Sequence, residues 1–567
     1  SSSDDPNQPA EPTVQLEFTP ASVTFGEDRS RAVELANTGD EAAGPVELVA
    51  LAVTDAGGNE VPGASLSVSP SEVATLNAGV SRALTLTLDV PGSVGSGDYD
   101  VDLEARVGGE AAASLGTSFS VVQDPGPVIE TLEITGGAPQ ARQGEVLSFA
   151  VSATDDQGQP VNDPMVTWRA EPAFAGLTTA GGEYVAYSVG TARIIAEAGG
   201  AADTVEVDVT SRDAPSGSFQ VAWHEPVELR YTSDHWEHGD VAYTGTWGCR
   251  AVPGGQCGNT LYVWDITVRT APVLTDSIQV DARVVNDVKV RADGTLAIIT
   301  HESSNDGLNG ITLLDLTDPL QPTVITRFAA PDLSPGVHNV WIEGDYAYLV
   351  VDGAVPSSGL RVLDISDPAN PLIVASFYGG GSFLHDVYVR DGLAFLSHWT
   401  TGLIILDVGN GVAGGSPTSP VEVSRIAVPG YDVHNAWYWP EAGYVFLGDE
   451  IAVPGRVLVI DVNDLSAPTQ AASFTLAGAA PHNFWVDEDA GIAYFSWYEN
   501  GIHAVDVSGR LLGELDKQAR QVASIQYDVG GACIAPSGTC SWAPQLHDGL
   551  IYVSDLNSGL WVLQPTF

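Results

Sequence analysis

The sequence predicts an all-β chain: two β-sandwich domains followed by a seven-bladed β-propeller that an N-terminal strand closes. Three observations predict this fold class. Glycine and proline are frequent, at 61 and 35 of 567 residues, which is typical of many strands joined by turns. Short alternating strands fill residues 13–211. From there on, an apolar strand ending in Asp recurs every 43 to 54 residues, and such a period indicates propeller blades.

The charge balance restricts the partners of the chain. It has 73 acidic and 22 basic residues, a formal net charge of -51, and lysine only at Lys289 and Lys517. Such a field repels phosphate backbones and anionic membrane surfaces, so we expect no nucleic-acid partner. The acidity suits solubility in a salty or extracellular medium, and the alternative is a surface that collects divalent cations. No apolar run reaches the roughly 18 residues of a transmembrane segment.

The N-terminus and the cysteines predict an exported protein. Residues 1–12, "SSSDDPNQPAEP", have the composition of a disordered acidic tether, as left after signal-peptide removal, with an N-terminal lipid anchor as one mode of attachment. Cys249 with Cys257 and Cys533 with Cys540 form two close pairs. We predict two local disulfides and an extracellular or cell-surface location. A zinc site built from all four thiols is the alternative, but neither pair has the spacing of a zinc knuckle.

Two sandwich domains precede the propeller. Residues 13–123 contain strands such as "ALTLTLDV" separated by turns such as "NTGDEAAG", a spacing that suits an Ig-like β-sandwich. Residues 128–211 carry a strand around Trp168 and the turn "DDQGQPV". These features resemble the bacterial Ig-like domains of surface proteins. The resemblance implies that the domain acts as a spacer.

The propeller is predicted over residues 213–567. Its markers are "LYVWDIT", "ITLLDLTDP", "LRVLDISDP", "LIILDVGN", "VLVIDVND", "IHAVDVSG" and the closing "LWVLQPTF". The last repeat has room for only three strands, so we expect "PVELRYT", residues 226–232, to supply the fourth and remove an open edge.

The repeats resemble a known family. "LRVLDISDPANP" with its relatives, together with "HNV", "HDV" and "HNFWVDED", is similar to the LVIVD-repeat family of exported bacterial β-propellers. The resemblance implies a propeller and a cell-surface setting, and the family has no agreed activity. The first and last repeats depart from the pattern because they lack the histidine at the repeated position.

Four of the 11 histidines occupy the same point of the repeat, just before the innermost strand: His338, His385, His434 and His482. Inner strands begin at one mouth of the ring, where second strands end, so we expect these four to converge there with His301 and His398. Imidazole binds zinc, copper, iron and nickel. A transition-metal site built from these six histidines is therefore one interpretation of the pattern.

Other residues at the second-strand ends suit ligand binding. They are Glu302, Trp399, Asp449, Glu450 and Trp497, whose carboxylates and aromatic rings could contact a sugar or peptide. Calcium is a further cofactor candidate at "ESSNDGLNG" and "DEDAG", although neither has the order of an EF-hand loop. The favoured interpretation of the four repeated histidines is structural: each would bond a neighbouring backbone group and lock adjacent blades together.

The leading functional hypothesis is an exported cell-surface binding or structural protein, whose spacers present a propeller to a surface glycan, a protein or another copy. No G-x-S-x-G, H-E-x-x-H or phosphate-binding loop occurs, so a catalytic role is not favoured. Two alternatives stay open. One is a metal-dependent enzyme using copper, iron or zinc at the histidine mouth. The other is a subunit of a self-assembling surface layer or filament.

Overall fold

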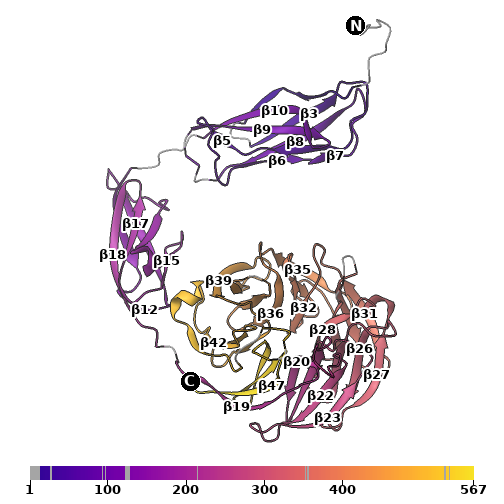
Figure 1. Ribbon diagram of the computed structural model, residues 1–567. Helices are drawn as coiled ribbons and strands as arrows, with labels where there is room; N and C mark the ends of the chain where they lie inside the picture. The colour runs from indigo at the N-terminus through magenta and orange to yellow at the C-terminus, as the bar shows by residue number, and fades with distance from the viewer. Residues whose placement is uncertain are drawn as a thin grey trace, which may run out of the picture. The chain divides into compact units, whose positions relative to one another are not determined.

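The computed structural model describes the chain in two compact units, Ser1–Val128 and Ile129–Phe567 (Figure 1). The described residues are all except 1–12, 26–28, 92, 93, 96, 122–127, 214, 352, 354–356, 452, 529–531 and 536. The predicted tether lies outside them. Helices among the described residues are short 3₁₀ segments: η1 (Ala173–Ala175), η2 (Pro331–Leu333) and η3 (Leu515–Gln518). The chain is therefore all-β, as predicted.

The first unit contains two sheets. Buried and exposed residues alternate along its strands, for example in β8, because successive side chains point to opposite faces of a sheet. The buried faces share one cluster that includes Leu35, Leu86 and Leu103. The first sheet has the order β1 (Leu16–Thr19), β3 (Ser30–Asn37), β8 (Ser81–Asp89), β6 (Ser65–Ser69). The second has the order β2 (Ser22–Phe25), β10 (Glu110–Val121), β9 (Gly97–Val107), β4 (Val46–Ala50), β7 (Glu72–Val73), with β5 (Thr54–Asp55) beside β9.

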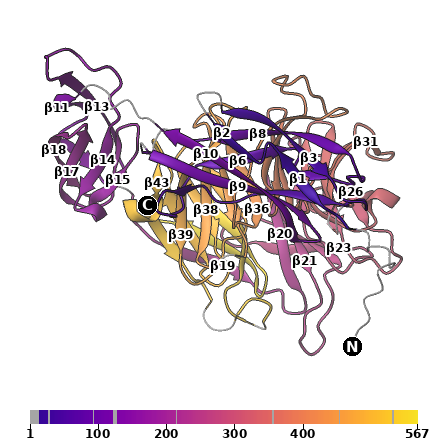
Figure 2. The ribbon, with the colours of Figure 1, turned by 90° about the horizontal axis from the view of Figure 1, so that it is seen from above.

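Residues 129–210 also form two sheets around one cluster. Trp168 covers it from the side, with its ring 6.3 Å from that of Phe149. The first sheet has the order β11 (Ile129–Gly136), β13 (Val146–Asp155), β16 (Glu183–Ala186), β15 (Gly176–Thr178). The second has the order β12 (Gln140–Arg142), β18 (Ala201–Thr210), β17 (Gly190–Ala198), β14 (Thr167–Glu171), and Figure 2 shows β18, β17 and β14 side by side.

The rest of the described chain forms a β-propeller of separate sheets, numbered here in chain order. Sheet 1 is β20 (Tyr231–His238), β21 (Val241–Trp247), β22 (Thr260–Asp265), β23 (Val273–Gln279). Sheet 2 is β24 (Val288–Val290), β25 (Leu296–His301), β26 (Gly310–Asp315), β27 (Thr323–Ala329). Sheet 3 is β28 (Val337–Glu343), β29 (Tyr346–Val351), β30 (Gly359–Asp364), β31 (Leu372–Phe377). Sheet 4 is β32 (Asp386–Arg390), β33 (Leu393–His398), β34 (Gly402–Asp407), β35 (Val421–Ile426).

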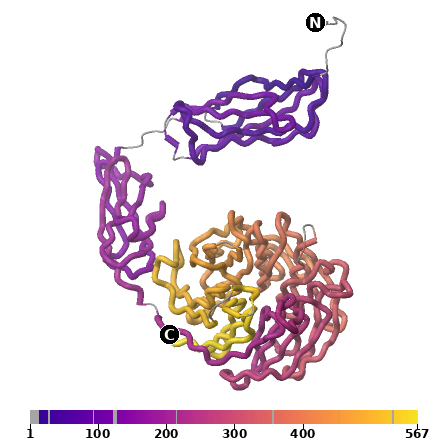
Figure 3. The backbone as a smooth tube through the Cα atoms, viewed as in Figure 1, coloured from indigo at the N-terminus to yellow at the C-terminus, as the bar shows by residue number. Residues whose placement is uncertain are grey.

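Three further sheets follow in the chain. Sheet 5 is β36 (Val433–Trp439), β37 (Tyr444–Asp449), β38 (Gly455–Asp461), β39 (Thr469–Leu476), with β43 (Gly513–Glu514) added at its edge. Sheet 6 is β40 (Phe484–Asp487), β41 (Ile492–Ser496), β42 (Ile502–Asp506), β44 (Gln521–Ile525). Sheet 7 is β45 (Ser541–His547), β46 (Leu550–Asp555), β47 (Gly559–Pro565), β19 (Phe219–Glu225). Figure 3 follows the chain around the ring.

An N-terminal strand closes the ring, as predicted, but the predicted segment was wrong. Strand β19 pairs antiparallel with β47, from Phe219 opposite Pro565 to Glu225 opposite Leu560. Residues 226–232 do not supply this strand. Pro226 lacks the N–H that a strand needs, so the ladder ends there, and Tyr231 already begins β20.

The repeated Asp that ends the third strand in sheets 1 to 6 has a local structural role. The carboxylate of Asp364 accepts hydrogen bonds from the backbone N–H and the hydroxyl of Ser366, at 2.9 and 2.6 Å. Asp315 caps the backbone N–H of Thr317 in the same way. Such Asx turns reverse the chain sharply. The repeat motif thus encodes the corner between the third and fourth strands.

The domain of residues 129–210 is docked on the propeller. Arg212, in the segment that follows this domain, donates to the backbone carbonyl of Gln143 at 3.2 Å and binds the carboxylate of Asp506, at 2.9 Å from Nε and 2.5 Å from Nη2. Arg520, which is 1% exposed, donates to the backbone carbonyl of Gly144 at 3.1 Å. The hydroxyl of Tyr187 accepts a bond from the N–H of Glu514 at 2.9 Å. These contacts explain why residues 129–567 form one compact unit.

Both predicted disulfides are present. Cys249 bonds Cys257, and Cys533 bonds Cys540. This confirms the pairing expected from the short loops.

Among the described residues, no helix has the length and hydropathy of a membrane-spanning segment.

Buried His503 makes stability depend on pH. It lies in β42, it is 6% exposed, and burial lowers the pKa of its imidazole to about 4. The unfolded value is about 6.5, so the unfolded state binds the proton more tightly between these limits. As the pH falls from 6.5 to 4, protonation of His503 is expected to lower the free energy of unfolding of the wild type by about 3 kcal/mol. His503→Gln should remove this loss. Urea titrations of both proteins across this range measure it, and parallel curves would contradict the assignment.

Candidate functional site

The four repeated histidines gather at one mouth of the ring. They belong to consecutive sheets: His338 lies in β28, His385 precedes β32, His434 lies in β36 and His482 precedes β40. Their ring centroids follow one another at 4.7, 4.4 and 4.2 Å. These four residues form the histidine cluster, and its convergence follows from one position repeated at the start of each inner strand.

The channel below the histidine cluster is lined by the same inner strands. A cavity of about 70 Å³ runs along Asp287, Lys289 and Asp386. Five aromatic side chains also line this cavity, with successive centroid distances of 4.5 to 6.1 Å. They are Trp236, Trp341, Tyr388, Trp437 and Trp485. The cavity is therefore lined by both aromatic and charged side chains.

One lysine sits among the acids of this channel. The ammonium of Lys289 lies 3.2 Å from a carboxylate oxygen of Asp234 and also contacts Asp287. Burial, and then the nearby carboxylate of Asp287, raises the pKa of Asp386 to about 8. One of the only two lysines in the chain thus offsets buried negative charge.

Glu450 approaches two members of the histidine cluster. Its Oε2 atom lies 3.7 Å from Nε2 of His385 and 3.8 Å from Nε2 of His434. Among the described residues, these three side chains offer ligand atoms that all lie within 4.8 Å of one another. Bonds of about 2.0–2.2 Å to one metal ion place ligand atoms somewhat over 3 Å apart. A small contraction would give two imidazoles and one carboxylate around a common centre.

Hydrogen bonds orient the imidazoles. Nδ1 of His385 bonds the backbone carbonyl of His434 at 3.2 Å, and Nδ1 of His482 bonds that of Trp542 at 2.7 Å. With the proton on Nδ1, the lone pair is on Nε2. Metal-binding histidines are held by their second nitrogen in this manner. The same bonds join neighbouring sheets, as the blade-locking hypothesis expects, so the two roles are compatible.

Burial favours neutral imidazoles in the cluster. Burial, and then the neighbouring imidazoles, hold the pKa of His385 well below its usual value. Burial and the imidazole of His434 do the same for the pKa of His482. Burial also lowers the pKa of His434, although the carboxylate of Glu450 opposes it. Neutral imidazole is the form that binds metal ions.

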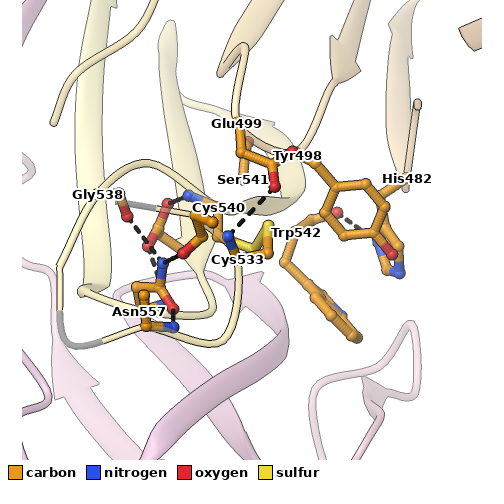
Figure 4. The surroundings of a disulfide bond; sticks show 12 residues. His482, Tyr498, Glu499, Cys533, Gly538, Cys540, Ser541, Trp542 and Asn557 are labelled. Carbon is orange, nitrogen blue, oxygen red and sulfur yellow. Dashed lines mark hydrogen bonds between the residues drawn. A yellow bond between two sulfur atoms is a disulfide. The ribbon is translucent and has the colours of Figure 1, made fainter. Parts of the chain in front are cut away.

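The structure places some of the other predicted residues at the mouth. Glu302 contacts Nδ1 of His338 at 2.7 Å, and the ring of Trp399 stacks on His385 at 5.1 Å. Tyr498 and Trp542 flank His482, with centroids at 5.1 and 4.0 Å. Figure 4 shows these two rings and the imidazole beside the Cys533–Cys540 loop.

Four predicted residues are not brought to the cluster. His301 is buried and bonds Thr312, and His398 is 2% exposed within sheet 4. The carboxylate of Asp449 binds Arg456. The indole of Trp497 is fully buried and donates to the carbonyl of Ala479. Each of these four residues directly precedes a residue at the mouth. Because successive side chains of a strand point in opposite directions, its own side chain points between sheets.

The two calcium candidates have internal partners. Asp306 in "ESSNDGLNG" binds Arg327 at 2.7 Å and caps the N–H of Leu308. Asp487 in "DEDAG" accepts the N–H of Ala490 at 3.0 Å. Both segments therefore contain side chains that close a turn.

Sequence reasoning placed Glu450 at the mouth but did not count it among the metal ligands. Glu302, Trp399, Glu450 and Tyr498 each follow the second strand of their sheets at the equivalent corner. The signal was present in four sheets: this corner residue is acidic in sheets 2 and 5 and aromatic in sheets 4 and 6.

One protein-family model matches part of the propeller. The LVIVD repeat family matches residues 336–378 and 384–428, which span sheets 3 and 4 and include His338 and His385. The chain is thus a β-propeller protein, and it contains LVIVD repeats. No curated protein shows a significant match. Among solved structures, it is similar to the crystal structure of the C-terminal WD40 domain of Sif2, with 13% identity, 77% of this chain and 99% of that chain covered, and a TM-score of 0.40.

Proposed function

We propose that this chain is an exported cell-surface binding protein in which two Ig-like domains carry a seven-bladed propeller, and that the histidine mouth binds a divalent transition-metal ion. The observation that carries the proposal is the approach of Glu450 to both His385 and His434, at 3.7 and 3.8 Å. His338 and His482 stand next to this group and are candidates for further ligands.

Two features support export. Both cysteine pairs are oxidised, which suits an oxidising compartment. The net charge of -51 suits an extracellular setting and attracts cations to the surface. A glycan, a protein or another copy would meet the mouth at the partly exposed ring of Trp399.

The donor set narrows the choice of metal. Two imidazoles with one carboxylate suit zinc, and they also match the arrangement of non-haem iron(II) sites. Three protein ligands leave coordination positions open. That favours metal-dependent catalysis as the second candidate function, since catalytic sites keep a position for water or substrate.

The metal content of tag-free protein tests the proposal. Protein stripped with a chelator is dialysed against Zn(II), Fe(II), Co(II) or Cu(II), and bound metal is measured by elemental analysis. We expect about one ion per chain for the wild type and a loss of at least about 100-fold in affinity for Glu450→Ala, because a ligand is removed. His547→Ala, outside the cluster, should bind as the wild type does. Wild-type protein that retains no ion would overturn the proposal.

A further inference from the structure

Glu450 uses its two carboxylate oxygens differently. Oε2 faces Nε2 of both His385 and His434. Oε1 accepts a hydrogen bond of 2.6 Å from the hydroxyl of Tyr498. A hydrogen bond to one oxygen favours a carboxylate that binds metal through the other, and such outer partners fix the orientation of the ligand. The geometry therefore separates a ligand atom from an anchored atom.

The side chain of Glu450 needs such an anchor. It follows β37 at the start of a loop whose neighbour Ile451 is 60% exposed. A glutamate side chain has three rotatable bonds, and holding it in one rotamer costs entropy. The bond from Tyr498 is therefore the contact that selects the rotamer aimed at the imidazoles.

Tyr498 is itself held from several sides. Its backbone carbonyl accepts the N–H of Ser541 at 3.0 Å, and Ser541 directly follows Cys540 of a disulfide. Its ring packs against His482 and, at 6.3 Å, against Trp542 (Figure 4). Its φ of 36° lies in the left-handed region, which costs a non-glycine residue energy and is retained where surrounding structure enforces it.

Chain topology explains why these two residues meet. Glu450 follows the second strand of sheet 5, and Tyr498 follows the second strand of sheet 6, at the equivalent corner of the repeat. Neighbouring sheets place equivalent corners side by side around the mouth. The contact joins an acidic corner to an aromatic one.

We propose that Tyr498 is a positioning residue of the metal site, and that its hydroxyl holds Glu450 as a ligand through one oxygen. The proposal rests on the metal site proposed above and extends it to a residue that does not touch the ion. The affinity and the coordination geometry of the site then depend on a single hydroxyl group on the adjacent sheet.

Tyr498→Phe tests this inference because it keeps the ring and removes only the hydroxyl. With Co(II) as the probe, we expect the dissociation constant to rise about 10- to 100-fold. We also expect the visible absorption of bound Co(II) to change, since the carboxylate is free to bind differently. Tyr243→Phe is the matched control: its hydroxyl donates to the backbone carbonyl of Pro319 at 2.8 Å, outside the histidine cluster, so binding should be unchanged.

A double variant separates positioning from general damage. On a Glu450→Ala background, Tyr498→Phe should cause no further loss of affinity, because the residue acts through Glu450. An additional loss of tenfold or more there would overturn the proposal, as would a Tyr498→Phe protein with the wild-type affinity and spectrum. A wild type that binds no Co(II) would instead overturn the metal site itself, and the role of Tyr498 with it.

Discussion

Replacing His434 by Ala is expected to abolish metal binding, with a loss of at least about 100-fold, while costing the metal-free fold less than the same change at His482. Nε2 of His434 faces Glu450 at 3.8 Å, and its Nδ1 has no hydrogen-bond partner among the described residues. We therefore expect the His434 imidazole to bind the metal ion but not to join neighbouring sheets. His482 locks sheet 6 to sheet 7 through the carbonyl of Trp542, and losing that bond leaves a buried acceptor unsatisfied at about 1–3 kcal/mol.

Two measurements distinguish these roles. Affinity is read by competition between the protein and a chelator for Co(II), and stability by urea unfolding in excess chelator. Both variants remove the same imidazole and leave similar cavities, so the difference in stability reports the lock. If His434→Ala binds metal normally and is the less stable of the two, the cluster locks the sheets and holds no ion.

Much of the candidate site could be predicted because it is periodic. His338, His385, His434 and His482 occupy one position of a repeat, and a propeller brings that position to one mouth. The second-strand ends were harder to place. There the chain turns a corner, and a shift of one residue decides between the mouth and the space between sheets. This one-residue difference places Glu450 at the mouth and points the side chain of His398 between sheets.

Other features had only a weak signal in the sequence. The predicted closing strand began seven residues too late. Both "FQVAWHE" and "PVELRYT" alternate as strands do, and only Pro226, the first residue of the second segment, argues against that segment. The docking of residues 129–210 on the propeller depends on Arg212, Asp506 and Arg520. Asp506 carries the repeat motif of an ordinary corner, so its second partner is visible only in three dimensions.

Replacing Asp506 by Ala is expected to release the second domain from the propeller. Asp506 is 5% exposed. Although burial alone would raise its pKa, hydrogen bonds from Ser508 and the guanidinium of Arg212 hold it below the ordinary value. Removing one partner of a nearly buried pair leaves the other charge uncompensated, at about 3 kcal/mol or more. Urea unfolding measures this loss, and hydrogen exchange should show faster exchange around residues 211–218.

Asp364→Ala is the matched control, since Asp364 holds the same repeat position and caps Ser366 without an arginine partner. Because that turn is exposed, Asp364→Ala should lower the free energy of unfolding by less than about 1 kcal/mol. Arg212→Ala should reproduce the effect of Asp506→Ala, and the double variant should be little worse than either, because both remove one interaction. Equal losses for Asp506→Ala and Asp364→Ala would mean that the carboxylate acts only as a turn cap. The second domain would then be a spacer carried by its linker, and the contact of Arg520 with Gly144 would be too weak to hold it.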